Sequence, residues 1–273
     1  MPDRAAMNRI GVVVPAHNEA ALIGRCLDSI VLAARGCAAR VDVVVVADSC
    51  VDGTARLAHT MGARVVEIGA GNVGRARAEG CEASLRDAAG DLWLAHTDAD
   101  SAVPRDWLAR QLRYAGHGAE VVAGAVEVDS WLDWPAALRG RYEAFYAGEQ
   151  TAGRHHIHGA NLGLSAHAYR AVGGFRPLVV GEDRALIAAA ERTGLSVAYP
   201  TDLVVRTSGR RGGRVDGGGF HQFLARMESG GPGHGADDPP SWFPLHDDGY
   251  PASWQRSCST STAPWSTRRT CTR

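Results

Sequence analysis

The sequence has 273 residues with 29 basic and 30 acidic side chains, which gives a formal net charge of −1. This balance provides no electrostatic reason to expect nucleic acid or an anionic membrane as the main partner. A hydrophobic share of 45% is typical of a globular chain, and the length suits one large α/β domain or two small ones. No apolar run reaches the roughly 18 to 20 residues of a spanning helix, so we expect no transmembrane segment.

The cysteines are scattered along the chain, without a CxxC pair or the spacing of a zinc site. They are Cys26, Cys37, Cys50, Cys81, Cys258 and Cys271. Unpatterned cysteines fit reduced thiols, and no export signal is visible. We therefore expect a cytoplasmic protein, and leave open its peripheral attachment to a membrane.

Strand and helix patterns alternate over the first hundred residues. The expected strands are Ile10–Val14, Val41–Val46, Arg64–Ile68 and Leu92–Ala95. Helical spacing of apolar residues follows each of the first three, over about 22–30, 54–61 and 74–89. This alternation predicts a Rossmann-like three-layer α/β/α sandwich with a mostly parallel central sheet.

The second half is less regular. A strand is expected over Val121–Val128, a helix from Trp131 with Pro135 in its first turn, a helix over about 182–193, and a strand at Ser196–Ala198. The aromatic face of the first helix is either core packing or the wall of an acceptor pocket. Residues 230–273 combine Gly, Pro, Ser and Thr without periodicity, which predicts a disordered tail.

Polar residues follow directly after each of the four expected strands. They are Pro15–Glu19, then Asp48 and Asp52, then Gly71, Asn72 and Gly74, and last Asp98 and Asp100. In an open parallel sheet, ligands bind outside the carboxyl ends of the strands. The sequence therefore predicts one ligand site at this edge.

The pair Asp98 and Asp100 carries the clearest chemistry. Two carboxylates separated by one small residue at a strand end can hold a hard divalent cation that also binds phosphate oxygens. The alternative is ordinary turn or cap chemistry. Asp48 can accept hydrogen bonds from a base or a ribose. The loop from Gly71 to Gly74 lacks both the GxGxxG spacing of a dinucleotide fold and the lysine of a P-loop.

These motifs, in this order and at these separations, resemble the family 2 glycosyltransferases of GT-A fold. The segments that carry the resemblance are Val13–Glu19, Asp48–Thr54, Asn72–Gly80, Asp98–Asp100, Gly173–Phe175 and Gly181–Asp183. The resemblance covers about residues 8–226. It implies a nucleotide-sugar-binding half over 8–128 and an acceptor half over 129–226.

The resemblance also implies roles for single residues. Nucleotide contacts are expected from Pro15, Ala16, His17, Glu19, Asp48, Asn72, Arg77 and Asp98. Asp98 and Asp100 would bind Mg²⁺ or Mn²⁺, Asp183 or alternatively Glu182 would be the catalytic base, and Thr207–Arg211 would reach the diphosphate. The acceptor side would include His158, Asn161 and Trp131.

The implied activity is metal-dependent transfer of a sugar from a nucleotide-diphosphate donor to the hydroxyl group of a small-molecule, lipid or glycan acceptor. The Gln-x-x-Arg-Trp mark of processive synthases is absent, so we expect single additions, and Ser49-Cys50 departs from the family pattern. Two alternatives stay open: a catalytically inactive nucleotide-sugar-binding protein, and a sugar-phosphate nucleotidyltransferase. The second should carry a Gly-rich, basic loop after its first strand, which this chain lacks.

Overall fold

A computed structural model describes residues 7–86, 91–151, 155–213 and 219–229. The chain divides into two units, Met1–Gly233 and His234–Arg273, and all described residues belong to the first. The predicted tail over 230–273 lies outside the described residues. None of the helices in the described ranges is both long and apolar enough to cross a membrane.

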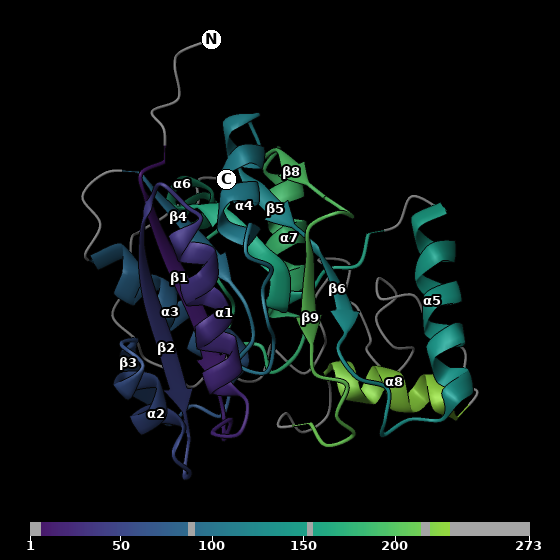
Figure 1. Ribbon diagram of the computed structural model, residues 1–273. Helices are drawn as coiled ribbons and strands as arrows, with labels where there is room; N and C mark the ends of the chain where they lie inside the picture. Colours follow the sequence, from purple (N-terminus) through teal and green to yellow (C-terminus); the bar gives the residue numbers. More distant parts are fainter. Residues whose placement is uncertain (1–6, 87–90, 152–154, 214–218, 230–273) are drawn as a thin grey trace, which may run out of the picture. The chain divides into compact units, whose positions relative to one another are not determined.

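The first half of the unit alternates strictly between strand and helix, as predicted (Figure 1). Its elements are β1 (Arg9–Ala16), α1 (Ile23–Arg35), β2 (Arg40–Asp48), α2 (Thr54–Thr60), β3 (Arg64–Ile68), α3 (Val73–Arg86) and β4 (Leu92–His96). All three strand pairs among them are parallel: β1 with β2, β1 with β4, and β2 with β3. This arrangement places the carboxyl ends of the four strands at one edge.

The second half extends the sheet with shorter elements. They are α4 (Trp107–Gly116), β5 (Val121–Ala123), β6 (Ala125–Val128), α5 (Ala136–Thr151), η1 (Gly159–Asn161), β7 (Leu162–Ser165), α6 (Ala166–Ala171), α7 (Glu182–Arg192), β8 (Val197–Ala198), β9 (Val204–Thr207) and α8 (Phe220–Glu228). The main sheet has seven strands in the order β3-β2-β1-β4-β7-β5-β8, in which only β7 runs antiparallel to its neighbours. The strands β6 and β9 form a separate parallel pair. The predicted α/β class with a mostly parallel sheet is confirmed.

The expected single strand over Val121–Val128 was wrong, because the structure divides it at Gly124. Its two parts, β5 and β6, belong to different sheets. A Cβ atom at Gly124 would lie 2.3 Å from Asn161 Nδ2, so the backbone passes closer to that amide than any larger residue allows. Asn161 in turn donates to the carbonyls of Ala125 and Leu203, which holds the two sheets together.

Alternate residues of the buried strands supply two cores on opposite faces of the sheet. On one face, Ile10, Val12 and Val14 pack with the apolar side of α1. On the other face, Val44 and Val46 pack with Ala76 and Ala83 of α3, and Val13 packs with Cys81. The sandwich therefore has helices on both faces, which explains why β1 is buried along almost its whole length.

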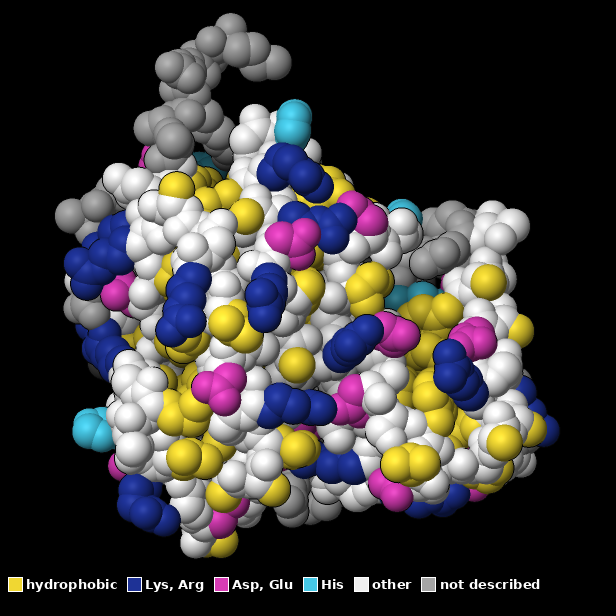
Figure 2. Space-filling model, in the orientation of Figure 1, with side chains coloured by type: hydrophobic (Ala, Val, Ile, Leu, Met, Phe, Trp, Pro, Cys, Tyr) yellow, Lys and Arg dark blue, Asp and Glu magenta, His cyan; other side chains and the backbone are white. Residues whose placement is uncertain are grey.

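A third cluster of apolar side chains is aromatic and links α5 to α8. Its members are Val128, Trp131, Trp134, Leu138, Tyr142, Phe145, Tyr146, Phe220, Phe223, Leu224 and Met227. Figure 2 shows hydrophobic side chains gathered on the visible surface beside α5. The aromatic face of this helix therefore packs against α8, in agreement with the core-packing interpretation, although the sequence analysis did not predict α8.

Gly80 tests how tightly α3 packs on the sheet. A Cβ atom there would lie 2.3 Å from Val13 Cγ1. Overpacking of this kind costs about 1 to 3 kcal/mol, whereas the higher helix propensity of alanine contributes about 0.5 to 1 kcal/mol. Gly80→Ala should therefore lower the free energy of unfolding. Gly140→Ala in α5, where a Cβ atom meets nothing within 4 Å, is the control and should be neutral or stabilising. Urea denaturation measures both, and a Gly80→Ala protein as stable as the control would contradict this packing.

Candidate active site

The loops after β1 and β2 interlock at the carboxyl edge of the sheet. His17 Nδ1 lies 2.6 Å from the carbonyl oxygen of Asp48, and the Val51 N–H donates to Asn18 Oδ1 at 2.8 Å. The Glu19 N–H donates to Thr54 Oγ1 at 2.8 Å. Asn18 adopts a positive φ of 54°, a conformation that asparagine tolerates better than most residues. Pro15 and Ala16 are buried at the end of β1, so backbone and side chains of both loops form one fixed wall.

Asp48 organises the next loop along the edge. Its carboxylate accepts hydrogen bonds from the backbone N–H groups of Ala70, Gly71 and Asn72 at 2.7 to 2.8 Å. Burial acts to raise the pKa of Asp48, but these hydrogen bonds and one from Ser49 hold it below its ordinary value. The structure therefore brings the predicted residues Asp48 and Asn72 into contact, with Asp48 as the anchor of the loop before α3.

Arg77 lies at the centre of the site, and its side chain is only 2% exposed. Its Nη2 donates to Asp98 Oδ1 at 2.6 Å, and its Nε donates to Glu182 Oε1 at 3.0 Å. Nη1 has no hydrogen-bond partner in the described part of the chain. A buried guanidinium requires such carboxylate partners, because its charge cannot be removed at neutral pH. Arg77 thus reaches the predicted nucleotide site through Asp98.

Asp100 faces a second arginine, Arg210, which follows β9. Arg210 Nη2 lies 3.2 Å from Asp100 Oδ2, and both terminal nitrogens of Arg210 bind the carboxylate of Glu19. Burial and the nearby Asp98 raise the pKa of Asp100 to about 7, while Arg210 acts in the opposite direction. Arg210 therefore lies at the carboxyl edge of the sheet, beside Glu19 and Asp100. It belongs to the segment Thr207–Arg211, which the sequence analysis expected to reach this edge.

Glu182 and Asp183 begin α7, directly after Gly181 with its positive φ of 81°. Glu182 is buried against Arg77, and burial together with the neighbouring Asp183 raises its pKa to about 7 despite that arginine. Asp183 is only half-buried. Its Oδ2 accepts from the Gly159 N–H at 2.7 Å, and its Oδ1 accepts from the Arg184 N–H. Of the two predicted bases, Asp183 is the more accessible carboxylate.

The three predicted acceptor-side residues have different surroundings. His158 lies one residue before the Gly159 that contacts Asp183, and its Nε2 is 3.1 Å from the Tyr146 hydroxyl. Burial lowers the pKa of His158 to about 3, with His156 and Arg184 adding to the effect, so the ring is neutral. Asn161 is fully buried, and its side chain binds Trp107, Ala125 and Leu203. Trp131 packs on Tyr142 at a ring distance of 5.2 Å, within the α5–α8 cluster.

The donor set at Asp98 and Asp100 fits a hard divalent cation. Among the described residues, no three or more His, Cys, Asp or Glu side chains are grouped so that they could hold a metal ion. A cation at Asp98 and Asp100 would therefore need further ligands from a bound molecule or from water. Mg²⁺ in nucleotide sites is commonly held by one or two carboxylates together with phosphate oxygens. Asp98 and Asp100 are 38% and 19% exposed, and each contacts an arginine through one carboxylate oxygen, Arg77 for Asp98 and Arg210 for Asp100.

A family model described as glycosyltransferase like family 2 matches residues 8–213. No curated protein sequence matches the chain. Among solved structures, a mannosyltransferase from Pyrobaculum calidifontis in complex with GDP-Man and Mn²⁺ is 26% identical, with a TM-score of 0.53 over 78% of this chain. This chain spans only 61% of the length of that enzyme.

Two further structures are similar in fold. TarS from S. aureus, with UDP-GlcNAc, has a TM-score of 0.57 at 13% identity over 81% of this chain and 65% of its own. Glucosyl-3-phosphoglycerate synthase from Mycobacterium tuberculosis, with Mn²⁺ and UDP-Glc, has a TM-score of 0.51 at 21% identity over 81% of this chain and 76% of its own. These likenesses show that the fold is GT-A.

Removal of Arg77 tests the buried ionic network directly. In Arg77→Met the buried Glu182 loses its counter-charge, which should lower the free energy of unfolding by about 3 to 5 kcal/mol. Arg75→Met, on the exposed side of the same helix, removes a surface pair with Glu79 and should cost less than about 0.5 kcal/mol. Urea denaturation compares the two variants. Equal stability of the two would show that the network contributes nothing.

Proposed function

Because this chain belongs to the glycosyltransferase-like family 2, we propose that it transfers a sugar from a nucleotide-diphosphate donor to an acceptor hydroxyl group. The observation that carries this proposal is the geometry around Arg77. One buried guanidinium binds Asp98, on the donor half, and Glu182, which adjoins Asp183 on the acceptor half. We assign residues 8–128 to donor binding and 129–226 to the acceptor.

The donor lies at the carboxyl edge of β1, β2 and β4 in this proposal. The interlocked loops around His17 and Asp48 form the wall against which the nucleoside binds. Asp98 and Asp100 would hold Mg²⁺ or Mn²⁺, and such a cation would supply positive charge to stabilise the leaving nucleoside diphosphate. Arg210 adds positive charge from the other side. The complexes of the mannosyltransferase with GDP-Man and Mn²⁺, and of the glucosyl-3-phosphoglycerate synthase with Mn²⁺ and UDP-Glc, support this choice of ligand and ion.

Asp183 acts as the base. An Oδ atom of Asp183 takes the proton of the acceptor hydroxyl, whose oxygen bonds to the anomeric carbon of the sugar. The bond from that carbon to the diphosphate oxygen breaks, and its electron pair leaves with the nucleoside diphosphate. Glu182 is unsuited to this step because it is 5% exposed and bound to Arg77. His158, neutral and next to Gly159, lies on the acceptor side of the same carboxylate.

The acceptor is a hydroxyl-bearing small molecule, lipid or glycan, to which one sugar is added at a time. The described cysteines, Cys26, Cys37, Cys50 and Cys81, are free thiols, which supports a reducing compartment such as the cytoplasm. A turnover assay with a panel of GDP- and UDP-sugars, in Mn²⁺ and in chelator, tests the proposal. Donor binding without turnover on any acceptor would instead identify a nucleotide-sugar-binding protein.

Asp183→Asn keeps the shape of the side chain and removes its ability to take a proton at neutral pH. Transfer should fall by about two to four orders of magnitude, the usual contribution of a general base, while donor affinity stays unchanged. Asp28→Asn, an exposed carboxylate on α1, is the matched control and should retain full activity. Full activity of Asp183→Asn would remove the residue from catalysis.

Asp100→Asn tests the metal assignment through binding alone. Mn²⁺ should increase the affinity of the wild type for nucleoside diphosphate by a certain factor. In the variant this factor should be at least about tenfold smaller, because one of the two carboxylate ligands is gone. Binding measured in chelator should change little, and Asp28→Asn should behave as wild type. Calorimetric titrations with and without Mn²⁺ give these affinities, and an unchanged metal effect in Asp100→Asn would contradict the assignment.

A further inference from the structure

The first residues of β2 have a strand on one side only. The pairing of β2 with β1 begins at Arg40, whereas its pairing with β3 begins at Val44. In the part of the chain that the structure describes, no strand pairs with residues 40–43 on the β3 side. An open strand edge of this kind is a template on which a further strand can add.

Val41 directs its backbone polar groups to this open edge. The Arg40 N–H donates to the Asn8 carbonyl, towards β1, and the Ser49 N–H donates to the Ile68 carbonyl, towards β3. Successive residues of a strand direct their hydrogen-bonding groups to opposite sides. Val41 is one residue from Arg40 and an even number of residues from Ser49, so its N–H and C=O are directed away from β1 and can pair with an added strand.

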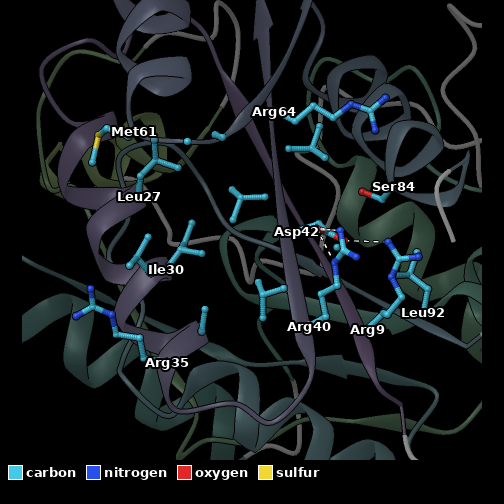
Figure 3. Close-up of a pocket in the computed structure, with 18 residues that line it drawn as sticks. Arg9, Leu27, Ile30, Arg35, Arg40, Asp42, Met61, Arg64, Ser84 and Leu92 are labelled. Carbon is cyan, nitrogen blue, oxygen red and sulfur yellow. Dashed lines mark hydrogen bonds and ion pairs between the residues drawn. The ribbon is translucent and has the colours of Figure 1, made fainter.

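A cavity of about 740 Å³ adjoins the open edge and has an apolar side. On this side Val41 and Val43 of β2 pack against the core beneath α1. Figure 3 shows Ile30 and Met61 on the same side of the strand. Val31 of α1 also lines the cavity and is 41% exposed. Further apolar side chains could therefore be buried on this side.

The opposite side of β2 is rich in arginine. Figure 3 shows Arg9, Arg40 and Arg64 on this side, and Arg35 at the end of the apolar side. Asp42 is the one acidic side chain in the described lining, and it is already paired within the chain. Its Oδ2 accepts from Arg9 at 2.9 Å, and its Oδ1 accepts from Arg40 at 3.3 Å. Burial acts to raise the pKa of Asp42, but these two arginines hold it below its ordinary value. The lining therefore carries an excess of positive charge.

We propose that the open edge of β2 binds an extended segment of another protein, in which acidic and apolar residues alternate. The backbone of the segment pairs with Val41. Successive side chains of a strand project to opposite faces, so every second residue meets the arginine side and the others meet the apolar side. Acidic residues lie beside Arg40 and Arg64, and apolar residues cover Val31 and Met61. The added strand extends the sheet beside the first turn of β2.

An extended acidic segment fits this edge better than three other occupants. An anionic membrane would need the arginine and apolar side chains on one surface, whereas β2 separates them, and lipid chains offer no hydrogen bonds to Val41. A free anion would leave the apolar side uncovered. A second copy of the edge would bring further arginines against an Asp42 that is already paired.

This edge lies at the amino end of β2, whereas Asp48, which belongs to the candidate active site, lies at its carboxyl end. Binding at the edge is therefore independent of the proposed transferase activity.

Fluorescence anisotropy of labelled synthetic peptides, titrated with the full chain, tests the proposal. The probe is a short peptide in which glutamate and valine alternate. A control peptide has the same composition in blocks of two like residues, so that both faces of its strand carry glutamate. The alternating peptide should bind saturably, and the block peptide should bind at least about tenfold more weakly.

Two pairs of variants test the two sides of β2. Arg40→Glu should raise the dissociation constant of the alternating peptide by at least about tenfold, because like charges then lie side by side. Arg170→Glu, at an exposed position of α6, is its control and should bind as wild type does. Val31→Asp places a charge on the apolar side and should weaken binding to the same degree. Leu32→Asp, at a residue that is 38% exposed and outside the cavity lining, should not.

Circular dichroism checks the fold of each variant. If Arg40→Glu fails to fold, Arg40→Gln replaces it and should weaken binding several-fold. A wild type that binds neither peptide, or binds both equally, would overturn the proposal. Unchanged binding by folded Arg40 and Val31 variants would do the same, and so would binding to phosphatidylglycerol vesicles without binding to the alternating peptide.

Discussion

The buried contact of Arg77 with Asp98 and Glu182 is the interaction on which the candidate site depends. A guanidinium stays charged at any physiological pH, so a fold that buries it must also place carboxylates beside it. The two partners come from β4's carboxyl end and from the first turn of α7. The contact therefore sets the distance between Asp98, which we assign to donor binding, and the helix that presents Asp183.

Gly159 makes this arrangement possible on the side of Asp183. A Cβ atom at Gly159 would lie 2.4 Å from Arg77 Nη2, so only glycine allows the backbone to pass over the guanidinium. The Gly159 N–H then reaches Asp183 Oδ2. Arg77, Gly159 and Asp183 thus form a continuous set of contacts, which holds the proposed base in place before any ligand binds.

Much of this architecture could be predicted from the sequence. The strands and helices up to His96 have strong periodic signals, and the rule that ligands bind at the carboxyl edge placed Asp48, Asp98 and Asp100 together. Local patterns could not reveal contacts between distant residues. Arg77 and Glu182 are 105 residues apart, and Arg210 and Glu19 are 191 apart. The division of the expected strand at Gly124 could not be predicted from the sequence either, because it depends on the packing of Asn161 rather than on the run of apolar residues.

A crystal structure of the chain with Mn²⁺ and a bound GDP- or UDP-sugar would show whether the donor occupies the carboxyl edge beside Arg77. We expect the metal at about 2.1 Å from carboxylate oxygens of Asp98 and Asp100. We also expect Arg77 to keep both of its carboxylate contacts, and Asp183 to face the anomeric carbon of the sugar. A nucleotide sugar bound elsewhere would contradict the proposed donor site, and a complex in which Arg77 has released Glu182 would contradict the role of the buried contact.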